Sequence, residues 1–400
     1  MRHFASISTI VTAAAAVLVF TACGGGSGGS NPALSPMVPS TTAGARSATN
    51  ALALDTDQGD DPDTDSPRSL LNRFDDIATI GSTVDPINGD QNPYGLDIAK
   101  SNAGKIRAGD LVVCNFNNNN ALGNVQGTGT TIVALHPRPG SAPERILQAE
   151  ELLGCTALAL GPTDAIWAAA FVENDNPIVS PGGAILTSLD GGPWHGPFGQ
   201  TFAGRSGPLR VAAFYESNAG DGSIVRININ PGRPFTFDVV ATGFPVNHGV
   251  PGSILGPSGL QYDAEHDRLY VVDGANDAVY SLRHVSTIPA HGLSVDRGGR
   301  SFDGPFARRA RVVFFGSPLN GPISSALLPN GNLVIGNTLD PNGKNLMIEI
   351  TPHGRLLAVK NVDTGAAGAL FGMVASGSND DNTRLYFNDD NENTVKVLTR

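Results

Sequence analysis

One unit of sequence recurs along most of the chain and constrains the fold more than any other feature. Its clearest copy is GPSGLQYDAEHDRLYVVDGANDAVYSL at residues 256–282, where charged turns separate short apolar runs. Six such units follow one another as far as Arg400. A unit that cannot bury both of its faces alone must stack against its neighbours to form a core.

Each unit predicts three or four antiparallel strands. A short strand follows Pro or Gly, a longer apolar strand ends in Asn or acidic residues, and a third strand follows every time. A fourth is visible in most units and is missing or very short in the second, where GGPWHGPF is rich in turn residues. No window keeps apolar residues at helical spacing for three turns, so we expect an all-β propeller with four-stranded blades.

The two ends of the repeat region predict how the ring closes. The sixth unit stops after its third strand, whereas an additional strand, FDDIATIGST at residues 74–83, precedes the first unit. That strand can complete the last blade and remove its open edge. We therefore expect a six-bladed β-propeller over residues 71–400, with the last blade closed by the N-terminal strand.

The first 23 residues have the pattern of a signal peptide. Arg2 and His3 precede an apolar run that is too short for a stable membrane span. The FTAC segment that follows resembles the bacterial lipobox, with Phe20 in place of the usual Leu, which implies lipidation of Cys23; ordinary secretion is the alternative. The resemblance predicts a lipoprotein of the bacterial cell envelope, on the outer membrane or on the periplasmic or extracellular face.

Residues 24–70 predict a flexible tether between the lipid and the propeller. They are dominated by Gly, Ser, Pro, Thr and Ala and contain the acidic run DTDQGDDPDTDSP, so they cannot bury enough surface to offset the entropy of ordering. The acidic run lacks the Gly-spaced loop and closing Glu of a calcium loop, which favours a solvated linker.

Charge and cysteine content limit the partners of the chain. A net charge of -11 at pH 7 repels phosphate backbones on average, which excludes nucleic acid as a partner. Besides Cys23, the chain has only Cys114 and Cys155. In an exported protein these two either form a disulfide, which requires α-carbons within about 7 Å, or are two small buried hydrophobic side chains.

The unit at residues 256–282 resembles the NHL and YVTN repeats, which share a Gly-hydrophobic start, an LYVAD-like strand, an Asn-containing bend and a valine-rich third strand. The resemblance implies a propeller and says little about activity, because propellers carry many unrelated functions. It also implies a binding face, formed by the loops that enter the inner strands and by the ends of the second strands.

Oxygen-bearing residues gather on that face from every unit. Together they can bind a hard cation such as calcium. Alternatively, each bonds its own backbone and shapes a turn, and their presence in every unit favours this interpretation. The residues are Asn115, Asn117, Glu173, Asn174, Glu216, Asn218, Asp273, Asn276, Asn337, Asp340, Asn388 and Asp389.

The fold is also distantly similar to the gluconolactonase and regucalcin-like lactonases, which hold calcium with Glu, Asn and Asp near the starts of the inner strands. The comparable positions here include no carboxylate; they are Tyr94, Cys155, Phe198, Ser258, Ser324 and Phe371. Asn92 and Asn320 lie nearby, but two amides supply no charge to hold a dication. The lactonase site therefore does not carry over.

Two histidines offer another candidate site. His195 and His248 both lie in segments that enter inner strands, and Glu216 is the nearest plausible carboxylate. A distantly similar propeller lyase uses His and Glu, and such a set can also bind a transition metal. Turn formation is the alternative, since Gly follows each His. We expect Trp194, beside His195, to be partly exposed and to offer a stacking surface.

These features favour a binding or scaffold module that presents its channel face to a protein or glycan. The alternative is a metal-dependent hydrolase or a lyase that uses His195, His248, Glu216 and a bound metal. A channel plugged by Tyr94, Phe198 and Phe371 would favour the binding module.

The long insertion at residues 286–309 contains four arginines and is interpreted as a solvated loop, with docking of an anionic partner as the alternative. The expected contact residues are Asn92, Asn115, Trp194, His195, His248 and Asp273.

Overall fold

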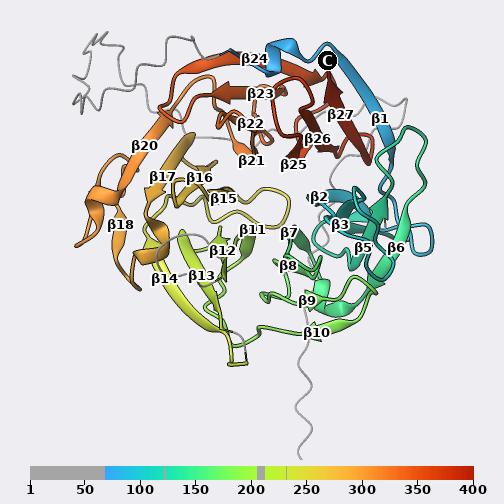
Figure 1. Ribbon diagram of the computed structural model, residues 1–400, viewed down its shortest axis with the longest axis horizontal. Helices are drawn as coiled ribbons and strands as arrows, with labels where there is room; N and C mark the ends of the chain where they lie inside the picture. The colour runs from blue at the N-terminus through green and yellow to red at the C-terminus, as the bar shows by residue number, and fades with distance from the viewer. Residues whose placement is uncertain (1–67, 121–122, 205–211, 231) are drawn as a thin grey trace, which may run out of the picture.

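Six small antiparallel sheets stand around a central axis in the computed structural model, which describes residues 68–120, 123–204, 212–230 and 232–400 (Figure 1). Apart from four short 3-10 turns, the elements of the described part are all strands. The predicted all-β, six-bladed propeller is confirmed. The expected signal peptide, lipidation at Cys23 and nearly all of the tether lie outside the described residues.

The blades follow one another in chain order, and the first strand of each unit lies innermost (Figure 1). Blade 1 contains β2 (Gln91–Ile98), β3 (Leu111–Asn120), β4 (Gly123–Val125), β5 (Thr131–Leu135) and β6 (Glu144–Gln148). Blade 2 contains β7 (Cys155–Leu160), β8 (Ile166–Ala170), β9 (Ile178–Val179) and β10 (Ile185–Thr187). Blade 3 contains β11 (Pro197–Ala203), β12 (Ala212–Asn218), β13 (Ser223–Ile229) and β14 (Thr236–Thr242).

The second half of the ring repeats this order. Blade 4 contains β15 (Pro257–Asp263), β16 (Arg268–Asp273), β17 (Ala278–Arg283) and β20 (Ala310–Phe315). Blade 5 contains β21 (Pro322–Leu327), β22 (Leu333–Asn337), β23 (Asn345–Ile350) and β24 (Leu356–Asp363). Blade 6 contains β25 (Leu370–Ser376), β26 (Arg384–Asp389), β27 (Thr394–Thr399) and, on its outer edge, β1 (Asp76–Ser82).

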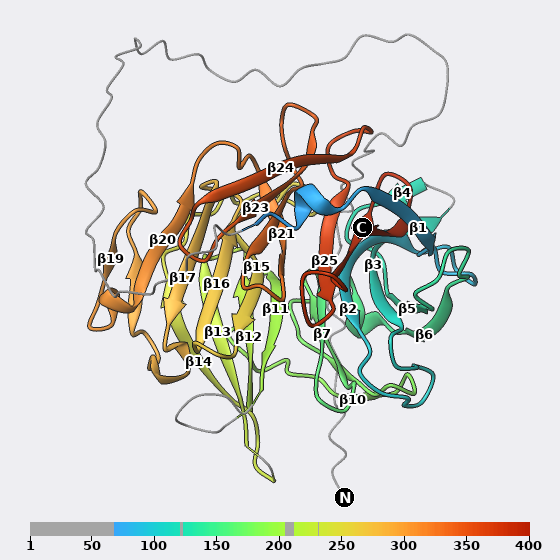
Figure 2. The same ribbon diagram turned by 45° about the horizontal axis from the view of Figure 1, so that its top comes forward.

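The N-terminal strand closes the ring as predicted. β1 pairs antiparallel with β27, with Ile77 opposite Leu398, and the two strands run side by side at the rim (Figures 1 and 2). The segment just before β1 is also anchored, because the buried Glu349 accepts hydrogen bonds from the backbone N–H groups of Leu70 and Leu71. Both leucines are fully buried, so the closure adds apolar packing to the strand pairing.

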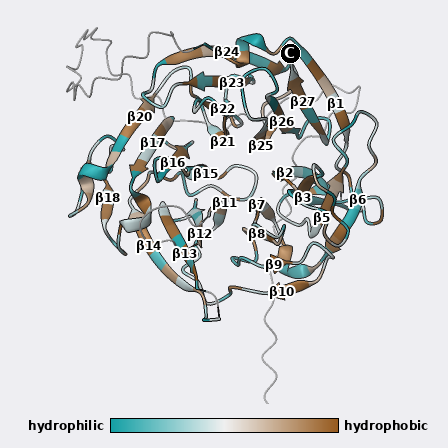
Figure 3. Ribbon diagram, viewed as in Figure 1, coloured by the Kyte–Doolittle hydropathy of each residue, from teal (hydrophilic) through white to brown (hydrophobic). Residues whose placement is uncertain are grey.

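Hydrophobic residues lie on strands all round the ring, and the cores form where the faces of neighbouring blades meet (Figure 3). At five of the six junctions a polar side chain also donates a hydrogen bond to an inner-strand carbonyl of the next blade. These bonds join Thr156 to Pro197, Ser217 to Ser258, Ser258 to Ile323, Ser324 to Leu370, and Asn388 to Tyr94, at 3.0 to 3.2 Å.

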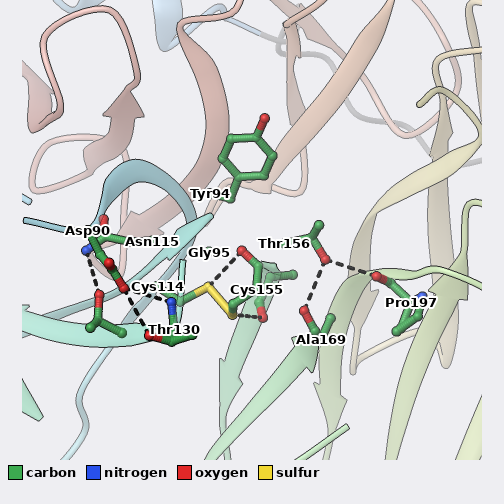
Figure 4. Close-up of a disulfide and its surroundings, with 12 residues drawn as sticks. Asp90, Tyr94, Gly95, Cys114, Asn115, Thr130, Cys155, Thr156, Ala169 and Pro197 are labelled. Atoms are coloured by element: carbon green, nitrogen blue, oxygen red, sulfur yellow. Dashed lines mark hydrogen bonds between the residues drawn. A yellow bond between two sulfur atoms is a disulfide. The ribbon is translucent and has the colours of Figure 1, made fainter. Parts of the chain in front are cut away.

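The sixth junction, between blades 1 and 2, is covalent. Cys114 on β3 and Cys155 on β7 form a disulfide with their α-carbons 6.0 Å apart (Figure 4). This separation is within the limit of about 7 Å for a bridge. The disulfide thus links a second strand to the next inner strand, as the Ser217 hydrogen bond does between blades 3 and 4.

The insertion at residues 286–309 is not a solvated loop, and that expectation is wrong. Its strand β18 (Leu293–Val295) pairs in parallel with β14 of blade 3, and β19 (Phe302–Asp303) extends the same sheet. Ile288, Leu293 and Val295 are buried against the blade, which explains why the arginine-rich segment is ordered. In blade 2 the segment expected as the third strand supplies the fourth strand instead: β9 is the third strand, and the three-residue β10 precedes residues 191–198, where the fourth strand was expected to be missing or very short.

Within the described ranges, no helix has the length and apolar character needed to cross a membrane.

Candidate functional site

Aromatic side chains close the channel at the face where the inner strands begin. Tyr94 at the start of β2 stacks on Phe116, with ring centroids 4.2 Å apart, and on Phe371, at 3.6 Å. Phe198 and Ile323, from two other inner strands, belong to the same buried cluster. The sequence analysis named Tyr94, Phe198 and Phe371 as residues that would plug the channel, and the structure places all three in this cluster.

The loop at residues 243–256 covers the cluster from outside. Figure 1 shows the segment that leads into β15 reaching over the centre of the ring. Ile254 is buried in the aromatic cluster and Leu255 packs against it. Asn247 holds the loop in shape, because its Oδ1 accepts hydrogen bonds from the N–H groups of Gly249 and Leu255, each at 2.8 Å. The loop is therefore an ordered cap.

Part of the outer surface of this cap is apolar. The side chain of Val250 is 61% exposed, and Val172, from blade 2, is 41% exposed. Gly127 lies between Val172 and Pro251, since a Cβ at Gly127 would come within 2.8 Å of one and 3.2 Å of the other. Val172, Val250 and Pro251, here called the valine patch, thus bring apolar surface from two blades together above the closed channel.

Behind the aromatic cluster lies a cavity of about 250 Å³, lined by all six inner strands. It extends toward the ends of the inner strands, where Asp97 and Lys100 both bond to Leu160: Lys100 Nζ donates to the carbonyl and Asp97 accepts from the N–H, each at 2.7 Å. Burial raises the pKa of Asp97, against the effect of its backbone hydrogen bonds and of Lys100. None of the six expected contact residues lines this cavity.

The structure does not assemble His195, His248 and Glu216 into one site. His195 is exposed and its Nε2 lies 3.9 Å from Asp221 Oδ2. Glu216 is fully buried, where it accepts hydrogen bonds from the side-chain amides of Asn176 and Gln200. Burial raises the pKa of Glu216 well above its usual range. His248 lies in the exposed cap loop with φ of 53°, a turn conformation.

Trp194 is buried, and the expectation of partial exposure is wrong. Its side chain is 3% exposed, its Nε1 donates to the carbonyl of Leu189 at 2.7 Å, and its ring meets Phe237 edge to face. The physical reason lies in blade 2, whose outer strands β9 and β10 are too short to cover the facing side of blade 3. Trp194 fills that space and is unavailable for stacking on a ligand.

The other expected contact residues bond neighbouring protein groups. Asn92 donates to Asp390 at 3.2 Å and Asn115 donates to the carbonyl of Thr83 at 3.0 Å. Asp273 Oδ1 accepts from the N–H of Ala275 at 2.9 Å, which is the turn-shaping role considered from the sequence. Burial raises the pKa of Asp273 to about 7.

One acidic cluster in the described part of the chain has ligand atoms within 4.8 Å of one another, and it consists of Asp363, Asp389 and Glu392. Lys396 already pairs with two of the three, with Nζ 2.6 Å from Asp389 and 3.1 Å from Glu392. Asn345 donates to Asp363 at 2.9 Å. A metal ion would have to displace the ammonium group, so this cluster is a salt-bridge network.

The inner-strand positions that correspond to a lactonase calcium site do not fit a dication. They hold aromatic rings, hydroxyl groups and the disulfide sulfur of Cys155. The nearby amide of Asn320 is bonded to Asp340 at 2.7 Å. We therefore derive no calcium chemistry at these positions.

Comparison with known proteins assigns neither a family nor an activity to the chain. No protein-family model matches the chain, and no curated protein matches it in sequence. A virginiamycin B lyase from Staphylococcus aureus is 12% identical, with a TM-score of 0.49, and the match covers 81% of this chain and 99% of that one. A putative gluconolactonase is 12% identical, with a TM-score of 0.47, covering 81% and 92% of the two chains.

A chain from a nidogen/laminin complex is 13% identical, with a TM-score of 0.47, covering 76% of this chain and 97% of that one. These titles include enzymes and a protein complex, and at such low identity the shared architecture does not select between activities.

Proposed function

We propose that the chain is a binding module of the bacterial cell envelope, anchored through lipidated Cys23, whose channel face docks a protein or a glycan. The closed channel end is the observation that supports the proposal. Tyr94, Phe116 and Phe371 fill the axis and the cap loop covers them. The face therefore offers a continuous surface to a large partner.

The valine patch gives that surface an apolar centre. Exposed apolar side chains from separate blades, surrounded by polar groups, are typical of protein contact sites. Around the patch, His195 and Asp221 supply polar groups that are accessible to a partner, with exposed side-chain fractions of 64% and 39%. Aliphatic contacts with a polar rim suit a protein surface or the face of a sugar.

Site-specific photocrosslinking in cells tests this proposal. A photoreactive amino acid at Val250 should yield one discrete adduct, whereas the same group at Val359, which is 43% exposed on β24, should not. Loss of the adduct on protease or on glycan hydrolase treatment identifies the class of partner. Val172→Asp should weaken the Val250 adduct. No adduct, or equal adducts from Val250 and Val359, would refute the proposal.

One observation favours the alternative, a metal-dependent hydrolase or lyase. Glu216 contacts Gln200, which lines the channel cavity, and Asn176. One oxygen of each of these three side chains is buried without a hydrogen-bond partner. A carboxylate and two amide oxygens are ligands that calcium accepts. This alternative uses neither His195 nor His248, and metal content decides it.

A further inference from the structure

Three arginines gather on one face of blade 4. Arg268 begins β16 and lies directly opposite Arg283 at the end of β17, while Arg311 on β20 lies opposite Ser281 of β17. Side chains of a strand alternate between its two faces, so these residues share the face of Tyr270, two residues after Arg268. Arginines in directly opposed positions destabilise a sheet unless the charge is compensated.

That face is turned toward blade 5. Tyr270 packs in one buried cluster with Leu333 and Ile350 of blade 5. Arg311 donates a hydrogen bond to the carbonyl of Pro352, in the turn between β23 and β24. The three guanidinium groups therefore lie at the junction of blades 4 and 5, near the ends of the inner strands and away from the channel-face cap.

No carboxylate in the described part of the chain forms an ion pair with these arginines. None of the ion pairs formed within the described ranges includes Arg268, Arg283 or Arg311, although the whole chain carries a net charge of -11. The carboxylate of Asp263 is near Tyr270, but it accepts from His266 Nδ1 at 2.7 Å and from the N–H groups of the turn. The cluster thus remains positive within an acidic protein.

Hydrogen-bond donors are also left without acceptors at this junction. Arg268 Nε, Arg311 Nε and Ser281 Oγ are buried and have no hydrogen-bond partner in the described structure. A buried donor without an acceptor is destabilising, and a positively charged one more so. Partial burial and the charges of Arg268 and Arg283 lower the pKa of Arg311. Partial burial and the charges of Arg311 and Arg268 lower the pKa of His353 nearby.

We propose that an oxyanion, a phosphate or a sulfate group, binds between blades 4 and 5 and is held by Arg268, Arg311 and Ser281. Guanidinium N–H groups and a hydroxyl match the acceptor oxygens of a tetrahedral anion, and the anion compensates the charge of three arginines. Arg283 and His353 lie at its open edge, where they are exposed. The site uses no residue of the channel face and is independent of the proposed function.

Thermal unfolding of the full chain in inorganic phosphate or sulfate, compared with chloride at equal ionic strength, tests the site. The Tm should rise with phosphate and saturate, because ligand binding stabilises the folded state. Arg311→Gln and Arg268→Gln should abolish the phosphate-specific rise. Arg384→Gln removes one exposed arginine from blade 6 and should retain it, which controls for net charge and for general salt effects.

Two outcomes would overturn the proposal: no phosphate- or sulfate-specific rise in Tm, or an equal rise in wild type and Arg311→Gln. If the glutamine variants do not fold, Arg311→Lys tests the site instead, because this variant keeps the positive charge and removes the Nε donor. Calorimetric titration with phosphate should show binding about tenfold weaker in this variant, the effect of one charge-assisted hydrogen bond. Unchanged affinity would count against the site.

Titration with glycerol 3-phosphate distinguishes free phosphate from the phosphate group of a larger ligand.

Discussion

At the scale of single residues, the structure separates side chains that shape turns from side chains with unsatisfied polar atoms. Asn92, Asn115 and Asp273 are tied to neighbouring protein groups, as the repeated occurrence of Asn and Asp indicated. The sequence did not reveal that Trp194 is buried. Its burial depends on the short outer strands β9 and β10 of blade 2, which leave space for the indole ring. Local Gly and Pro residues alone indicated an exposed loop.

Asp273 provides a residue-scale test. Its pKa of about 7 exceeds the unfolded value near 3.9, so from about pH 4 to 7 the folded state holds a proton that the unfolded state has lost. This group should therefore lower the unfolding free energy as pH rises through that window, by on the order of 4 kcal/mol in total.

Asp273→Asn keeps the acceptor for Ala275 and removes the titration. Its stability relative to wild type should grow from pH 4 to pH 8 in denaturant unfolding, while that of Asp75→Asn, at an exposed position, should not. Parallel pH curves for wild type and Asp273→Asn would show that this carboxyl is not perturbed.

At the scale of elements, the local sequence pattern of turns and apolar runs predicted most of the strands. The elements that it did not predict depend on pairing between segments far apart in the chain. Each repeat carries its own turns, so the strands of a blade and the closing strand β1 follow from local sequence. The parallel pairing of β18 with β14 joins two blades and leaves no local signature. The arginine cluster was missed for the same reason, since only the register of three strands brings Arg268, Arg283 and Arg311 together.

Removal of residues 71–84 from the full chain tests the role of the closing strand. The deletion removes β1 and the buried Leu71 and Phe74, so it should reduce the unfolding free energy by at least about 4 kcal/mol. It also exposes the edge of β27, which should cause self-association measurable by sedimentation.

A synthetic peptide of residues 71–84 should restore the monomer and part of the lost Tm, whereas a scrambled peptide should do neither. A deletion variant that stays monomeric with an unchanged Tm would show that the ring does not depend on this strand.

At the scale of the whole molecule, the ring has two ends with different character. The channel face is capped and carries the valine patch, while the cavity and the arginine cluster lie toward the other end. The sequence placed Tyr94, Phe198 and Phe371 at the starts of inner strands, where a plug by them would favour the binding module. It did not indicate the cavity, whose lining depends on how six inner strands meet around the axis.

The most direct test of whether the channel face acts by binding alone is the metal content of the full chain. The protein is extracted in detergent and purified without chelator. A binding module predicts no stoichiometric calcium or zinc by elemental analysis. One equivalent of calcium that is lost in Glu216→Gln would contradict this account and would assign metal-dependent chemistry to the buried Glu216, Asn176 and Gln200.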